Sequence, residues 1–174
     1  MLIWVAVGIV LLVVALAVLL YNRLTRARNR THAAWGDVDS ELRRRADLVP
    51  ELNAAVAAYA EHERSALEAA AEARGAAHGD DPAARAAAET RLGSAIGGVV
   101  GIAEAYPELR ASERFTQLQQ QLSQSENRIA LARMVYNDTV QTYNSAIEAL
   151  PASLVAGTLG FHRRDLFELA DGRA

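Results

Sequence analysis

The sequence contains no cysteine and no lysine, and only ten of its 174 residues are aromatic. The absence of cysteine excludes a disulfide framework and thiolate metal sites, and it agrees with a reducing compartment. Alternating strand patterns and Asn-Gly hairpin signals are also missing, whereas Ala, Leu, Glu, Arg and Gln dominate. This composition predicts an all-α protein.

The motifs of common catalytic and cofactor sites are absent as well. His62 and Glu63 begin an H-E-x-x-H pattern, but Ala66 stands where the second histidine of a zinc protease would be. The glycine-rich stretch 93–101 lacks the phosphate-loop pattern G-x-x-x-x-G-K-[ST], and no G-x-S-x-G nucleophile elbow is present. We therefore expect a protein that is not an enzyme and that holds no cofactor and no metal.

The most prominent feature that is present is an apolar run over residues 2–20, nineteen residues without a charge. At about 1.5 Å per residue it would form roughly 28 Å of helix, close to the hydrocarbon thickness of a bilayer. The small-x-small sequence at 15–17 is typical of a signal-peptidase site, but no basic segment precedes the run, and the run continues past that site. We predict a retained single membrane anchor over residues 1–21, with Trp4 and Tyr21 near its two interfaces.

Basic residues gather directly after this run, with no acidic residue in 21–36: Arg23, Arg26, Arg28 and Arg30. By the positive-inside rule they place the N-terminus outside and the following domain on the cytoplasmic side of the membrane. From residue 37 onward fourteen arginines stand against twenty-one acidic residues, a net charge of −7. A basic collar with an acidic body favours anionic lipid and argues against a nucleic-acid partner.

The residues that follow the anchor have the pattern of an antiparallel, up-and-down four-helix bundle over 22–150. The first helix continues out of the membrane with a heptad seam: Leu24, Arg28, Thr31, Trp35, Val38 and Leu42. Pro50 predicts a turn, with Asp47 as the N-cap of a second helix that ends near residue 78. The alternative is a kink at Pro50, because the seam continues to Tyr59, and this alternative gives three long helices.

The third helix is predicted from Pro82 to about residue 105, capped by Asp80 or Asp81. Its glycines at 93, 97 and 101 each cost up to about 1 kcal/mol relative to alanine in a helix interior. Close approach of a neighbouring helix against Gly93, Gly97 and Gly101 would offset that cost, either inside the bundle or between subunits. The uncharged part of this helix is too short for a second membrane span.

The last helix, predicted over about 109–150, has large side chains every seven residues: Phe115, Leu122, Ile129, Tyr136, Tyr143 and Leu150. Smaller side chains occupy the second coiled-coil position: Leu118, Ser125, Ala132, Thr139 and Ala146. The tail 151–174 is too apolar for a free end. Phe161 and Phe167, beside Arg163 and Arg164, are expected to cover the bundle or to contact a membrane or a partner.

Several runs of this sequence resemble the LemA family. The front half carries Tyr21-Asn22-Arg23-Leu24, Ala34-Trp35, Leu42-Arg43-Arg44-Arg45-Ala46-Asp47-Leu48-Val49-Pro50-Glu51-Leu52 and Tyr59-Ala60-Glu61-His62-Glu63. The back half carries Tyr106-Pro107-Glu108-Leu109, Glu126-Asn127-Arg128-Ile129-Ala130, Tyr136-Asn137, Tyr143-Asn144, Gly160-Phe161 and Phe167-Glu168. The resemblance implies a single-span membrane protein with a cytoplasmic four-helix bundle and no assigned enzymatic activity or cofactor.

These patterns favour a non-enzymatic, membrane-anchored scaffold or adaptor that presents its bundle to protein partners. A membrane protease, which the resemblance suggests as a neighbour, or a second copy of the chain could be such a partner. The alternative is a lipid-interacting protein that organises the membrane through its arginine collar and its tail. A sensor or hydrolase is a weaker alternative, because it would need a polar pocket that the sequence does not indicate. The arginines at 43–45 are expected to form a helix-end face favoured by the helix dipole, with binding of phosphate or an acidic partner as the alternative. Tyr59, like the heptad aromatics, is expected in the core.

Overall fold

The computed structural model describes residues 1–79 and 81–169, and over these residues the protein is helical without strands. The main helices are α1 (Leu2–Ala57), α2 (Arg64–Ala76), α3 (Pro82–Gly101) and α5 (Glu113–Glu148). Three single turns complete the described elements: η1 (Ile102–Glu104), α4 (Pro107–Arg110) and η2 (Ala152–Leu154). The all-α prediction is confirmed.

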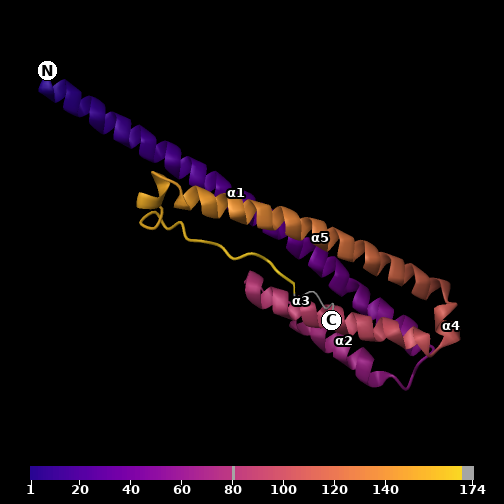
Figure 1. Ribbon diagram of the computed structural model, residues 1–174. Helices are drawn as coiled ribbons and strands as arrows, with labels where there is room; N and C mark the ends of the chain where they lie inside the picture. Colours follow the sequence, from indigo (N-terminus) through magenta and orange to yellow (C-terminus); the bar gives the residue numbers. More distant parts are fainter. Residues whose placement is uncertain (80, 170–174) are drawn as a thin grey trace.

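The two long helices α1 and α5 pack along each other, and two different segments cover them (Figure 1). The α2–α3 hairpin packs on the half of α1 that lies far from the N-terminus. After η2 the tail runs back along the other half until its end meets the first turns of α3, where Phe167 and Ala86 share one buried cluster. The chain therefore reverses after α1, α2, α3 and α5, and the tail returns toward the middle of the molecule.

The prediction of a turn at Pro50 is wrong, because α1 continues through Pro50 to Ala57. A proline in a helix interior costs about 3 kcal/mol. The same stretch buries Val49, Leu52 and Val56 almost completely, and burying each side chain is worth about 1.5–3 kcal/mol. Burial of this seam therefore outweighs the cost of the proline, and the chain stays helical.

The chain turns instead at 58–63, after the apolar seam of α1 has ended. Four main helices result even though Pro50 makes no turn, so the alternative with three long helices is also wrong. Because the chain reverses three times before α5, this helix runs antiparallel to α1 and returns toward its apolar end, where the tail begins (Figure 1). Asp47, the expected N-cap, is an exposed residue inside α1.

Pro50 also provides a contact between α1 and α2. Because proline has no N–H, it cannot donate to the carbonyl of Ala46, four residues earlier. Arg74 of α2 donates its Nε–H to this carbonyl oxygen at 2.9 Å, and Ala46 itself is buried. The carbonyl that the proline leaves without its helical partner thus becomes an attachment point for α2.

The predicted cap of α3 and most of the predicted buried positions are confirmed, and two predicted core residues are wrong. Asp81 caps α3 by accepting the Ala84 N–H at 2.8 Å, whereas Asp80 lies outside the described residues. The large heptad positions of α5 from Phe115 to Tyr143 are buried as predicted. Leu150 and Tyr59 are exposed, because each lies just beyond the end of its helix, where the helical period no longer directs it inward.

We expect Arg74→Ala to destabilise the protein by about 1–2 kcal/mol, because it leaves the buried Ala46 carbonyl without a donor. In a Pro50→Ala background the same substitution should cost clearly less, since the new N–H of residue 50 supplies the carbonyl. Urea unfolding of the full chain in mild detergent, followed by circular dichroism, measures both values.

Asp47→Asn is the matched control, because it removes only the exposed ion pair between Arg74 and Asp47. Such a pair is worth less than about 1 kcal/mol. Equal costs of Arg74→Ala in both backgrounds would contradict the role assigned to the proline.

Candidate functional site

Helix α1 is, among the described residues, the one helix that is long and apolar enough to cross a membrane. Its most apolar 18-residue window has a mean hydropathy of 3.2, and none of that window is buried in the protein. Leucine and valine side chains therefore point outward on all sides over residues 2–19. A helix that is apolar all round and unburied is typical of a membrane span.

Three arginines of the predicted collar line an open groove between α1 and α5. Arg23, Arg26 and Arg30 face Asp138 and the hydroxyl-bearing Thr142 across this groove. Guanidinium groups are suited to phosphate because their N–H donors match its oxygens. The groove could hold the phosphate of a lipid headgroup next to the end of the apolar segment.

Arg28 lies on a different face of α1 and packs on the tail. Its guanidinium carbon lies 5.0 Å from the centre of the Phe161 ring, and Tyr21 contacts the same ring edge-on with centroids 5.7 Å apart. Phe161 is only 2% exposed. Phe161 thus joins the tail to the end of the apolar segment and is not an exposed interaction residue.

Two Tyr-Asn pairs of α5 hold the tail. Tyr143 donates to the carbonyl oxygen of His162 at 2.9 Å, and Tyr136 donates to that of Asp165 at 3.1 Å. The adjacent asparagine side chains each form two hydrogen bonds with the backbone of a single tail residue: Asn144 with Arg164, and Asn137 with Phe167.

The spacing of the two pairs matches the spacing of their targets. Seven helical residues separate them, about 10.5 Å at 1.5 Å per residue. Three residues separate Arg164 from Phe167, and an extended chain at about 3.3 Å per residue spans nearly the same length. One heptad of α5 is therefore as long as three extended residues of the tail, so both asparagines can bind it at once. Phe167 is fully buried beside Trp35, with ring centroids 5.3 Å apart.

Beside this tail, Arg164 donates to Nε2 of His32 at 2.6 Å. The acceptor nitrogen carries no proton, so His32 is neutral in this arrangement. Partial burial, together with the positive charges of Arg164 and Arg28, lowers the pKa of His32 below its ordinary value of 6.5. The folded state thus favours the neutral imidazole.

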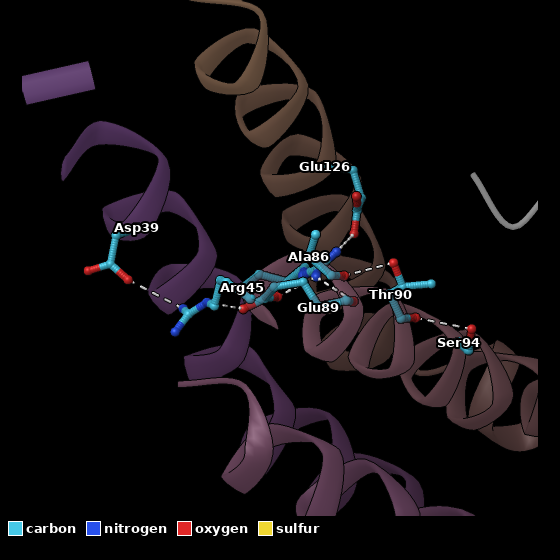
Figure 2. Close-up of polar contacts among 8 residues, drawn as sticks. Asp39, Arg45, Ala86, Glu89, Thr90, Ser94 and Glu126 are labelled. Carbon is cyan, nitrogen blue, oxygen red and sulfur yellow. Dashed lines mark hydrogen bonds and ion pairs between the residues drawn. The ribbon is translucent and has the colours of Figure 1, made fainter. Parts of the chain in front are cut away.

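The other half of the protein contains a buried network of ion pairs (Figure 2). Arg45 of α1 contacts Glu89 of α3 and Glu126 of α5, each at 2.6 Å. Arg85 lies 2.9 Å from the other carboxylate oxygen of Glu89 and 3.4 Å from Asp39 of α1. The side chains of Arg45, Arg85 and Glu89 are almost completely buried.

This network fixes three helices relative to one another. Leaving one buried charge without its partner costs about 3–5 kcal/mol, so a shift of α1 or α3 that separated Arg45 from Glu89 would be strongly disfavoured. The expectation of a helix-end face at 43–45 is wrong, because α1 continues to Ala57 and Arg45 is buried against α3. Arg43 and Arg44 are exposed.

Among the described residues, no helix backbone closely approaches the glycine face of α3. A methyl group built on Gly93 would meet only the end of the Arg45 side chain, at 3.7 Å, and on Gly97 or Gly101 it would meet nothing within 4 Å. Close helix approach inside the bundle is therefore wrong for Gly97 and Gly101, and contact between subunits stays a prediction. Over residues 1–79 and 81–169, no three His, Asp or Glu side chains come together to hold a metal ion.

Comparison with protein families gives a match to the LemA family over residues 34–174. The chain belongs to the LemA family. The match begins inside α1 and continues past the tail residues that the Tyr-Asn pairs hold. It confirms the resemblance found in the sequence.

The chain is also similar to curated magnetosome proteins. It is 33% identical to MamQ of Magnetospirillum gryphiswaldense over 91 residues, 51% of this chain and 34% of that protein. It is 31% identical to MamQ 1 and to MamQ 2 of Paramagnetospirillum magneticum over 81 residues, 47% of this chain and 30% of each relative. The matched segment thus spans about a third of these relatives. Together with the apolar α1, these similarities identify a membrane-associated protein of the LemA type.

Sequence reasoning missed the Tyr-Asn pairs and the ion-pair network of this LemA-family chain. The Tyr-Asn pair at 136 recurs seven residues later at 143. The heptad pattern accounts for both tyrosines as buried residues, and it assigns no role to the asparagines. The sequence does not indicate that Glu89 is buried, because one acidic residue in an Ala-rich helix is usually exposed. Arg163, which pairs with Glu148, remains exposed.

We expect Glu89→Gln to destabilise the protein by about 3 kcal/mol or more, because it leaves the buried Arg45 and Arg85 without their shared carboxylate. Glu126→Gln is the matched control: it changes the same network at a half-exposed carboxylate, where a pair is worth less than about 1 kcal/mol. Urea unfolding of the full chain in mild detergent measures both. Similar small effects of the two substitutions would contradict a register-setting role.

A second prediction concerns pH. Because the pKa of His32 is lower in the folded state than the ordinary 6.5, the unfolded state binds more protons between these two values, and stability falls as pH drops through that window. NMR titration of the His32 ring should give a pKa below 6.5, and Arg164→Gln should move it upward. Arg163→Gln, whose arginine pairs with Glu148, should move it less. A larger shift from Arg163→Gln would contradict the contact.

Proposed function

We propose that this protein is a non-enzymatic membrane scaffold that presents its helical domain to protein partners on the cytoplasmic side of the inner membrane. The observation that carries the proposal is an apolar face in the middle of α5. Leu131, Met134 and Val135 are 60%, 62% and 50% exposed, although they belong to a helix that buries its heptad positions elsewhere.

These three side chains lie on one face, because residues three and four apart are neighbours on a helix. An exposed apolar cluster on an otherwise solvated helix is typical of a docking surface. Met134 suits such a surface, since its unbranched side chain adapts to different partners. The fitting occupant is an amphipathic helix of another protein, which would lay its apolar face against α5.

The position of this face agrees with a scaffold. Helix α1 connects the apolar segment to the domain without a break, so a partner bound on α5 would be held at a fixed height above the bilayer. The arginine collar supports the cytoplasmic orientation of the domain.

A second candidate function, organisation of anionic lipid, is favoured by the groove between Arg23, Arg26 and Arg30. Because this groove lies beside the end of the apolar segment, headgroup phosphates would reach it without leaving the membrane surface. This function would not need the apolar face of α5.

Photo-crosslinking in native membranes distinguishes these functions. With benzoyl-phenylalanine in place of Met134, we expect crosslinks to a discrete protein; with the same residue in place of Gln120, an exposed polar position of α5, we expect none. Leu131→Gln should reduce the Met134 crosslink by about tenfold, the effect of losing roughly 1.4 kcal/mol of apolar contact.

The same reagent in place of Thr142, which lines the arginine groove, reports the second function through crosslinks to lipid. Lipid capture at Thr142 without protein capture at Met134 would replace the scaffold by the lipid function. Protein capture that is equal at Met134 and Gln120 would contradict the docking face.

A further inference from the structure

The segment 149–160, here named the tip, joins α5 to the tail and exposes four apolar side chains. Leu150 and Leu154 are 77% and 75% exposed, and Val155 and Leu159 are exposed to a lesser degree. Two alanines of the same segment, Ala152 and Ala156, are buried in a cluster with Leu24 and Phe161. The alanines fix the tip to the protein, and the larger apolar residues point away from it.

The tip lies at the level where the apolar segment of α1 ends. Leu20, the last residue of the apolar run 2–20, packs against the cluster that buries Ala152 and Ala156. Figure 1 shows η2 beside α1 at this level, far from α2 and α3. If α1 crosses a bilayer, the tip is at the membrane surface.

The composition of the tip fits lipid. From Ala149 to Phe161 the chain has thirteen residues without a charge, and the charges at its two ends, Glu148 and Arg163, pair with each other. Its backbone forms local hydrogen bonds, among them Ser153 N–H to Ala149 O and Ala156 N–H to Ala152 O. The Thr158 hydroxyl donates to the carbonyl of Val155. Because many of its polar groups are already hydrogen-bonded within the segment, the tip can enter the apolar edge of a bilayer at a reduced cost.

We propose that the tip is a second membrane contact, inserted through Leu150, Leu154, Val155 and Leu159 into the leaflet on the domain side. The occupant of this apolar surface is the bilayer itself, because the tip packs against Leu20, where the exposed apolar side chains of α1 begin. The inference rests on membrane insertion of α1 but is independent of partner docking on α5. Two contacts, the span and the tip, restrain the tilt of the domain and determine which of its faces is turned toward the membrane.

Spin labelling tests this contact, because the chain contains no cysteine and one introduced cysteine is the unique label site. Leu154→Cys, Leu12→Cys and Leu131→Cys place labels on the tip, in the span and on the exposed face of α5. The full chain is reconstituted into vesicles of phosphatidylcholine and phosphatidylglycerol. Power saturation with oxygen, which concentrates in lipid, and with a water-soluble nickel chelate gives the environment of each label.

We expect the Leu154 label to resemble the Leu12 label, with high oxygen and low nickel accessibility, while the Leu131 label shows the reverse. A Leu154 label that is as accessible to nickel as the Leu131 label, with Leu12 still in lipid, would overturn the tip contact and leave the span intact. A nickel-accessible Leu12 label would overturn the insertion on which the inference rests. Leu150→Cys repeats the measurement in case labelling at residue 154 disturbs the fold.

Discussion

The continuity of α1 is the constraint on which the rest of the structure depends. One helix carries the apolar segment, the arginine collar and the first packing surface of the domain. It stays helical at Pro50 because burial of the seam side chains outweighs the free-energy cost of the proline. In addition, Arg74 donates a hydrogen bond to the Ala46 carbonyl, which the proline cannot reach with an N–H. As a result, the domain is an extension of the span, and α5 must return alongside it to the same end.

The two halves of the α1–α5 pair are fixed by different chemistry. Near the apolar segment, tyrosine and asparagine side chains bind the backbone of an extended tail. In the far half, buried ion pairs bind α3 to α1 and α5 (Figure 2). Both arrangements have a single satisfactory register, because a shift along the helix would leave a buried charge or a backbone group unpaired. Apolar packing supplies the stability, and these polar contacts select one alignment.

The sequence was sufficient for the helical class, the apolar segment and the buried heptads, because each rests on a periodic pattern that needs no knowledge of a partner element. It was insufficient at Pro50, where local propensity favours a turn and only tertiary burial of Val49 and Leu52 reverses the outcome. The contacts of Arg45 and Asn144 could not be predicted from the sequence for the same reason. Their partners lie 44 and 20 residues away, and no local signal links them.

The continuity of α1 past Pro50 is what makes the domain an extension of the apolar segment. A double electron–electron resonance distance between spin labels at Arg30 and Ala57, both exposed on α1, tests it most directly in the cysteine-free chain. Twenty-seven residues of unbroken helix predict a narrow distribution near about 40 Å, at about 1.5 Å per residue. A turn at Pro50 would bring the labels to within about 20 Å by the same rise, and that result would contradict the account.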